Sequence, residues 1–400
     1  MTKQKKSLMW TILAIGIIQM PSLALISSIA TIHETVFPMY SLGTIQTVMQ
    51  LTNFVSPVLT IIMSFLISRH VVTKRFCVIV GLFLLGGVAL FATTLNTQFW
   101  MLCTMCALLG IAHGLFVPVS ASILFDNFNE DERRVLVGYQ TSAINGGGIL
   151  MSVLGGFLAT QVWYGGWYAL YLGLPVAVMA ILFIPKVKKG DNRAADGKEL
   201  TAEDRKFNVD MLFYVALIMV FSILYGVMGG NISSLISSQG VGTSATSGII
   251  TGISMAGGVT TGVLFGKISS KLDDQINATA YLLIAIGFTI IAFGSTSIVA
   301  IAIGAFIAGG SMSMIMPQCN FGISNRVTVA TSAVGSMLGF SIAPGLGSFL
   351  SPVIMTNVTS AIFGPTAIKQ RYFFTAGVAL VLAIVVSLLV AYRKKRGISS

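Results

Sequence analysis

The sequence predicts an all-α membrane protein in which twelve transmembrane helices form two six-helix bundles. Hydrophobic residues make up 55% of the 400-residue chain and charged residues only 9%, whereas a soluble domain carries about a quarter charged residues. Long stretches without any Asp, Glu, Lys or Arg alternate with short charged segments. Short motifs of the first half recur in the second half at nearly constant spacing, which indicates an internal repeat.

The uncharged stretches are long enough for helices that need about 20 apolar residues to cross the hydrocarbon. Helices are favoured over a β-barrel because these stretches are continuously apolar and do not alternate in polarity. The predicted spans of the first half are 8–30, 42–67, 76–94, 99–125, 135–161 and 167–185. Those of the second half are 209–235, 244–266, 276–294, 297–318, 329–352 and 371–392.

Basic residues give the chain a formal net charge of +11, which invites a nucleic-acid interpretation. Their positions argue against it. If the N-terminus is cytoplasmic, every Lys and Arg except Lys369 and Arg371 falls on a cytoplasmic segment. This distribution follows the positive-inside rule. The sequence therefore predicts a multi-pass protein of the cytoplasmic membrane, with both termini in the cytoplasm and no nucleic-acid partner.

The longest hydrophilic stretch lies near the midpoint and divides the chain into two halves. We expect an N-terminal bundle at 1–185, a cytoplasmic central loop at 186–208 and a C-terminal bundle at 209–400. Three pairs of segments support a repeat: Ser64–Arg69 with Gly262–Lys267, Gly110–Pro118 with Gly309–Pro317, and Gly148 and Gly156 with Gly339 and Gly347. Two units of six helices would share one orientation in the membrane.

Polar side chains within the first two spans are candidates for a cavity lining. Gln19 and Ser22 share a broad face of the first span, and Gln46, Gln50 and Asn53 form a stripe along the second. Carboxamides that face lipid are costly, so this stripe faces protein or water. A hydrogen bond between helices and a polar cavity would both satisfy it.

Two ionisable residues are candidates for proton coupling. His113 lies near the middle of the fourth span, and histidine titrates near neutral pH. It could carry a proton, or it could be a neutral histidine bonded to a neighbouring helix. Glu34 lies at the outer end of the first span. An ionisable group in a membrane is a functional candidate, and the alternative is an exposed carboxylate at a helix end.

Motifs for cofactors and for catalysis are weak or missing. Cys103 and Cys106 have a metal-like spacing, but they lie in an apolar span without a second pair, so packing is favoured. The sequence contains no Walker motif for ATP. It also shows no paired carboxylates and no nucleophile–base pair at a readable spacing. We therefore expect neither a cofactor nor an enzymatic activity.

The chain resembles the small bacterial twelve-helix members of the major facilitator superfamily. Residues 64–75 look like the family signature between the second and third helices, with the basic Arg69 kept and the usual Asp replaced by Ser68. The segment from Cys106 to Gly110 is similar to the fourth-helix motif, with Cys106 in place of its Arg. The glycines and Ser152 of the fifth span resemble a motif typical of antiporters.

The resemblance implies a carrier with a central cavity lined by the first, fourth, seventh and tenth helices. The expected cavity residues are Gln19, Ser22, Gln46, Gln50, Asn53, His113 and Tyr225. His113 and Glu34 are the expected coupling residues. At the inner ends of helices, the charged residues expected to close an inner gate are Arg69, Asp126, Lys267 and Arg326. For each basic residue of this set, a role in membrane topology alone is the alternative.

The sequence thus predicts a secondary active transporter that moves a small organic solute by alternating access, with protons as the coupling ion. A monomer in the lipid bilayer is expected. A multidrug/proton efflux antiporter is the alternative within the same class, and the loss of the motif Asp and Arg weighs against it. A membrane receptor or scaffold that does not transport is the alternative of another class.

Overall fold

The computed structural model describes residues 3–69, 71–128, 130–186, 210–272, 275–326, 335 and 337–395, and these residues form helices and no strand. The first half contains α1 (Lys3–Ile17), α2 (Leu23–Ile26), α3 (Ile29–Thr31), η1 (Ile32–Val36), α4 (Leu42–Met49), α5 (Leu51–Ser68), α6 (Lys74–Thr94), α7 (Phe99–Asn127), α8 (Glu130–Leu158), α9 (Gly165–Tyr168), η2 (Ala169–Leu172) and α10 (Gly173–Phe183). The second half contains α11 (Met211–Ser238), α12 (Ser244–Leu272), α13 (Ile276–Phe293), α14 (Ile298–Ser324), η4 (Leu338–Ile342), α16 (Ala343–Ser351), η5 (Pro352–Thr356), α17 (Asn357–Phe363) and α18 (Ile368–Lys395).

Eleven helical segments of the described chain are long and apolar enough to cross a membrane. They correspond to the second through twelfth predicted spans. The all-helical membrane fold that the sequence predicts is therefore confirmed. The predicted central loop at 186–208 lies outside the described residues except for Lys186, and so does the start of the eleventh span at 329.

The first predicted span, 8–30, is interrupted in its middle. α1 ends at Ile17 and α2 begins only at Leu23. Pro21 explains this break, because a proline lacks the backbone N–H and its ring clashes with the carbonyl group four residues earlier, which here belongs to Ile17. The break leaves backbone carbonyl groups without partners inside the helix, and one of them is used at the candidate site.

The eleventh span extends beyond its predicted end at 352. It continues from Leu338 to Phe363 and passes Pro352 without stopping. Pro352 opens the π-helical segment η5, whose wider hydrogen-bond pattern tolerates the missing N–H of proline. A second π-helical segment, η4, precedes Pro344 in the same span. These two wide turns keep the span continuous where the sequence indicates an end.

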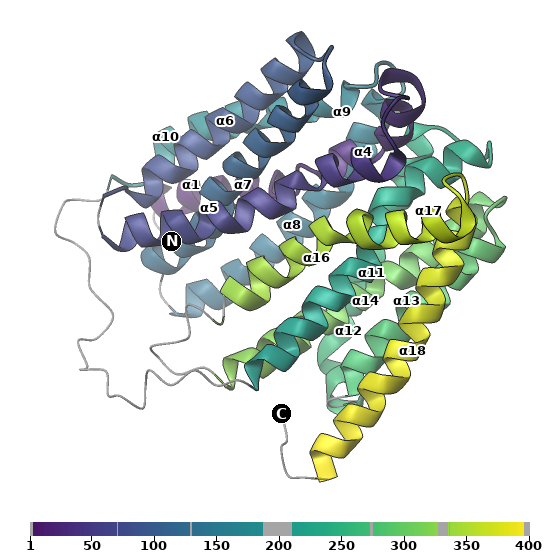
Figure 1. The fold of residues 1–400 in the computed structure, drawn as a ribbon. Helices are drawn as coiled ribbons and strands as arrows, with labels where there is room; N and C mark the ends of the chain where they lie inside the picture. Colours follow the sequence, from purple (N-terminus) through teal and green to yellow (C-terminus); the bar gives the residue numbers. More distant parts are fainter. Residues whose placement is uncertain are drawn as a thin grey trace.

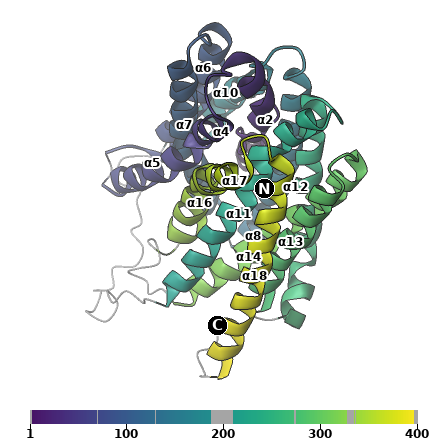
Figure 2. The same ribbon diagram turned by 45° about the vertical axis from the view of Figure 1, so that its right-hand side comes forward.

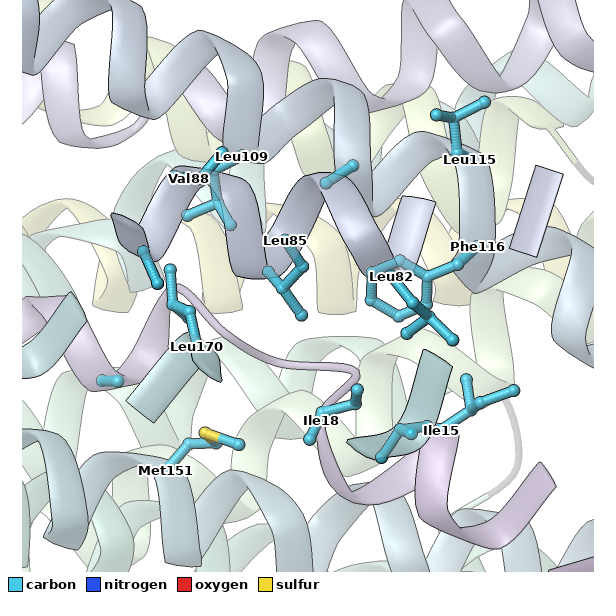
Figure 3. Close-up of a cluster of buried hydrophobic side chains, with 14 of the residues drawn as sticks. Ile15, Ile18, Leu82, Leu85, Val88, Leu109, Leu115, Phe116, Met151 and Leu170 are labelled. Atoms are coloured by element: carbon cyan, nitrogen blue, oxygen red, sulfur yellow. The ribbon is translucent and has the colours of Figure 1, made fainter. Parts of the chain in front are cut away.

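Two hydrophobic cores form, one from residues 8–184 and one from residues 211–390. In the first, Leu82 and Leu85 of α6 meet Phe116 of α7, Ile15 of α1 and Met151 of α8 (Figure 3). The second is built around aromatic and aliphatic side chains of α11, α13, α14 and α18. Many large apolar side chains outside both cores are exposed, as expected for helices that face lipid.

The bundles have two distinct ends. At one end, Lys5 Nζ lies 2.7 Å from Glu132 Oε2, and Arg393 Nη2 lies 3.4 Å from Asp210 Oδ1. We call it the basic end, because the described charges cluster there and because Lys186 and Asp210 flank the connection between the halves. The other end, which carries Glu34 and the turns at Ser41, Gly240 and Gly364, is called the far end.

Helices of the two halves meet along two seams. α16 and η5 lie between α4–α5 of the first half and α11 of the second (Figures 1 and 2). The second seam joins α8 to α12. Glycines let the helices approach each other closely at both seams. A Cβ added at Gly345 would lie 2.5 Å from the Asn53 carbonyl oxygen, and one added at Gly156 would lie 2.9 Å from Gly248 Cα. Glycine allows such close approach of helices in lipid.

Candidate functional site

His113 joins three helical segments inside the first bundle. Its Nδ1 lies 2.8 Å from Ser56 Oγ of α5, and its Nε2 lies 3.1 Å from the Gln19 carbonyl oxygen at the break after α1. A carbonyl oxygen only accepts, so Nε2 carries the hydrogen. In the neutral ring, Nδ1 then accepts a hydrogen bond from the Ser56 hydroxyl. A protonated ring would donate to Ser56 instead, so either charge state keeps both contacts.

Close packing of α5 against α7 brings His113 to Ser56. A Cβ added at Gly114 would lie 2.7 Å from the Ser56 carbonyl oxygen, and one added at Gly110 would lie 3.0 Å from that of Thr52. The Thr52 hydroxyl also donates to the Cys106 carbonyl oxygen over 3.0 Å. The fourth-span segment that resembles a family motif therefore forms this helix contact.

Gln19 and Ser22 lie at the break in the first span. The Gln19 side-chain Oε1 is buried, and it has no hydrogen-bond partner within the described part of the chain. An unpartnered buried acceptor is costly, so it is suited to a ligand donor or a water. Ser22 is half-buried at the start of α2 and caps no backbone group there.

Gln46 lies at the far end of the seam between the bundles and is only 1% exposed. Its Nε2 donates to the Gly230 carbonyl oxygen over 2.6 Å and to Asn231 Oδ1 over 3.0 Å. Its Oε1 accepts from the Thr356 hydroxyl over 2.6 Å. Both hydrogens and the oxygen of this first-bundle carboxamide are thus bonded to the second bundle.

Gln50 and Asn53 continue this stripe toward the basic end. Asn53 Nδ2 donates to Gln50 Oε1 over 2.5 Å, and both side chains are half-buried. The stripe faces α16 and η5 of the second bundle. Tyr225 lies near the middle of α11, where its hydroxyl is 3.2 Å from Ser254 Oγ of α12 and its ring stacks on Phe221. Tyr225 is also half-buried, and the two contacts just given lie within the second bundle.

Glu34 is exposed at the far end and belongs to η1. The Ser237 hydroxyl of α11 lies 2.9 Å and 3.1 Å from its two carboxylate oxygens. Close by, the Ser233 hydroxyl donates to the Ser27 carbonyl oxygen over 2.7 Å. These hydrogen bonds join the two bundles at the far end.

A crevice of about 330 Å³ opens beside these far-end contacts. It lies between α3, the turn after α8 and the start of α12, and hydroxyl-bearing side chains and Trp163 line it. Its position between the two halves makes it part of the surface that would change if the bundles separated.

The structure describes three of the four side chains expected at the inner gate. Arg69 is exposed, with its guanidinium carbon 4.7 Å from the centre of the Phe65 ring. Lys267 is exposed on α12. Arg326 donates to the Gly322 carbonyl oxygen at the end of α14 and lies over the Tyr214 ring. The side chain of Asp126 lies outside the described residues.

Arg371 is a further buried polar residue, and sequence reasoning did not select it. It is the only Asp, Glu, Lys or Arg among the buried residues of the described ranges, with an exposed fraction of 0%. Its guanidinium contacts Asn231, which also accepts a hydrogen bond from Gln46. A sequence signal existed, because Arg371 and Lys369 are the two basic residues that break the charge distribution.

The described residues contain no group of three or more His, Cys, Asp or Glu side chains that could hold a metal ion. Cys77, Cys106 and Cys319 are free and buried, and Cys103 is free and half-buried. The Cys106 thiol lies 4.0 Å from the sulfur of Met49, so it is part of the α4–α7 packing.

Comparison with known proteins places these features in a family. The sequence profile of the Major Facilitator Superfamily matches residues 7–344. Comparison with curated proteins finds no match. Among solved structures, the nucleoside transporter NupG has a TM-score of 0.73 at 15% identity and covers 97% of this chain and 99% of its own.

Peptide transporters of the POT family are also similar. One in complex with sulfate has a TM-score of 0.74 at 15% identity, covering 96% of this chain and 94% of its own. Another, in complex with 5-aminolevulinic acid, has a TM-score of 0.73 at 11% identity, with 95% of each chain covered. At such identities the similarity establishes the fold, and the profile match establishes the family. The chain therefore belongs to the Major Facilitator Superfamily.

Proposed function

We propose that this protein is a secondary active transporter that moves a small organic solute across the cytoplasmic membrane by alternating access, coupled to protons. The family and the fold support transport and point away from enzymatic catalysis. The similar structures belong to transporters of nucleosides and of peptides, which are small organic solutes. The basic end would face the cytoplasm, because the positive-inside rule places Lys and Arg there.

One observation carries this proposal: a group of hydrogen bonds joins the two bundles at the far end. Such a contact closes one entrance between the bundles. Two separate hydrophobic cores support movement of each bundle as a unit. In alternating access, the two bundles separate at the far end while they come together at the basic end, and then do the reverse.

The proposed transport path runs between the bundles, past the polar groups near mid-length of the helices. Its lining would comprise Gln19, Ser22, Gln50, Asn53, His113 and Tyr225, with Gln46 closing the far end. At the basic end, Arg69, Asp126, Lys267 and Arg326 would form the second closure. This lining is neutral except for His113, which suits an uncharged or zwitterionic solute better than a strongly charged one.

His113 is the proposed coupling residue, because its Ser56 contact can reverse direction when the ring gains a proton. Glu34 has a different environment. Its exposed carboxylate contacts Ser237 across the far-end seam, so we propose that it supports far-end closure and is a less suitable proton carrier.

The first test is a thermal-shift screen of the purified protein against metabolites and drugs at two pH values, since a bound ligand raises the unfolding temperature. A stabilising compound is then used for counterflow in proteoliposomes. Substrate-dependent counterflow is expected, and its absence with a tightly bound compound would favour a receptor. In the same vesicles, His113→Ala should abolish accumulation driven by a pH gradient while counterflow remains. Wild-type accumulation by this variant at every pH would exclude His113 from coupling.

A further inference from the structure

The far-end contact contains a buried positive charge whose partners are neutral. Arg371 Nε lies 2.9 Å from Thr359 Oγ1, Nη1 lies 2.5 Å from Asn231 Oδ1, and Nη2 lies 2.9 Å from Ser360 Oγ. A longer contact of 3.5 Å joins Nη2 to the Pro365 carbonyl oxygen. No acidic side chain of the described chain pairs with Arg371. A charge buried in this way is costly unless its hydrogen bonds are satisfied.

The local fold brings these acceptors together. Gly364 has a φ of +94°, a conformation that favours glycine, and it turns the chain from α17 into α18. This turn lays α18 back against α17, so that Arg371 faces Thr359 and Ser360. Asn231 belongs to α11 and lies more than a hundred residues before Thr359 and Ser360 in the sequence.

Arg371 determines which side of the Asn231 carboxamide faces the seam. A guanidinium has only donors, so it requires the oxygen Oδ1 on its side. The Asn231 Nδ2 then donates to the Val227 carbonyl oxygen over 2.9 Å. The second lone pair of Oδ1 remains for Gln46, whose Nε2 lies 3.0 Å away. In this arrangement Arg371 keeps Asn231 Oδ1 where it accepts the hydrogen bond from Gln46 of the first bundle.

The same guanidinium also supports the other side-chain partner of Gln46. Thr356 lies one turn before Thr359 and Ser360, both of which accept from Arg371. Thr356 donates to Gln46 Oε1, while Thr359 donates to the Met355 carbonyl oxygen in the same turn. One side chain therefore connects α11, α17 and α18 behind the surface that receives Gln46.

We propose that Arg371 is the positioning residue of the far-end closure. It holds Asn231 and the Thr356 segment in the arrangement that accepts Gln46, and so it sets how long the far end stays closed. Arg371 itself touches neither the first bundle nor the proposed transport path. The inference rests on the proposed function only in requiring that the two bundles separate at this end.

The test measures opening of the far end with a cysteine reporter at Ala30. Ala30 is 4% exposed, and its N–H lies 3.4 Å from Ser233 Oγ across the seam. A cysteine there reacts with a maleimide when the bundles separate. Labelling is measured in nanodiscs, where both faces are accessible, and the protein without the Ala30→Cys change supplies the background from its native cysteines.

In the reporter protein, Arg371→Met should raise the labelling rate about tenfold, as expected when a charged hydrogen-bond partner is removed. Gln46→Leu should raise it by a similar factor. The double variant should label no faster than the faster single variant, because both changes break one unit. Lys369→Met is the matched control, since it removes an exposed positive charge of the same helix, and it should leave the rate unchanged.

Arg371→Lys separates positioning from charge. A lysine keeps the charge but lacks the planar fork that reaches three acceptors, so its labelling rate should lie between those of the unchanged residue and Arg371→Met. A rate for Arg371→Met equal to that of the Lys369→Met control would overturn the proposal. Multiplied effects in the double variant would also overturn it, because they would show that Arg371 acts independently of Gln46.

Failure of the proposed function gives a different result. If Gln46→Leu opens the far end and Arg371→Met does not, the closure exists and Arg371 does not position it. If neither variant changes the rate, the far-end contact is not a moving closure. Should Arg371→Met fail to fold, Arg371→Lys and its double variant with Gln46→Leu make the same comparison.

Discussion

Half-buried His113 and buried Arg371 both belong to polar networks, yet these networks have opposite arrangements. The partners of His113, Ser56 and Gln19, belong to its own bundle. The network around Arg371 reaches Gln46 of the other bundle through Asn231. The first network can persist while the bundles move, whereas the second must break. Under the proposed motion, polar contacts within a bundle would keep it rigid, and polar contacts across the seam would form and break.

The largest expected effect concerns the packing that holds His113 in place. Gly114→Ala should lower the free energy of unfolding by about 1–3 kcal/mol, because the added Cβ overpacks α7 against the Ser56 backbone. Thermal unfolding in detergent measures this change. Gly87→Ala on α6 is the control, since an added Cβ there meets nothing within 4 Å. Equal stability of the two variants would contradict close α5–α7 packing.

His113→Leu should destabilise the protein by about 2 kcal/mol, because two part-buried hydrogen bonds are lost and their partners stay unpaired. Far-end labelling at Ala30→Cys should not change, since no His113 contact crosses the seam. Gln46→Leu, in contrast, should label fast, because its hydrogen bonds cross the seam. Fast labelling in His113→Leu would remove the distinction between the two networks.

Ser56→Ala should cost about 1 kcal/mol, because it removes one of the two hydrogen bonds of His113. It should also shift the pH dependence of transport, since the neutral ring loses the donor to its Nδ1. Ser64→Ala on the same helix is a suitable comparison at a half-buried serine. A pH profile identical to that of the unchanged protein would separate Ser56 from proton coupling.

The smallest effect is expected for Glu34→Gln, at about 0.5 kcal/mol or less, because an exposed contact is weak and Gln keeps an oxygen for Ser237. Proton-driven accumulation should persist. Its complete loss would make Glu34 a coupling residue and would move that role away from His113. Transport against a pH gradient in proteoliposomes decides between these outcomes.

The sequence predicted most of the fold because membrane helices leave strong local signals. Uncharged stretches predicted the spans, and the positions of Lys and Arg predicted on which side of the membrane each connecting segment lies. The break at Pro21 was readable in principle, because a proline within a span disrupts its hydrogen bonds. The passage of the eleventh span through Pro352 was not, because η5 depends on the neighbours that hold its wide turn.

The candidate site was only partly accessible to sequence reasoning. Periodicity selected Gln46, Gln50 and Asn53 as one face, and the structure places that face on the seam. It could not show that Gln46 meets Asn231, because that contact joins residues 185 positions apart. Arg371 was noticed as an exception to the charge distribution. Its burial could not be predicted, because it depends on the packing of α18 against α17.

The two π-helical segments give the eleventh span an uncommon mechanical property. A π turn holds more residues than an α turn, so conversion of η5 into α-helical geometry would rotate the following residues by about 100° about the helix axis. Such a register slip would turn Thr356 away from Gln46 without sliding the entire span through the bilayer. A span made uniformly α-helical would lose this adjustable element.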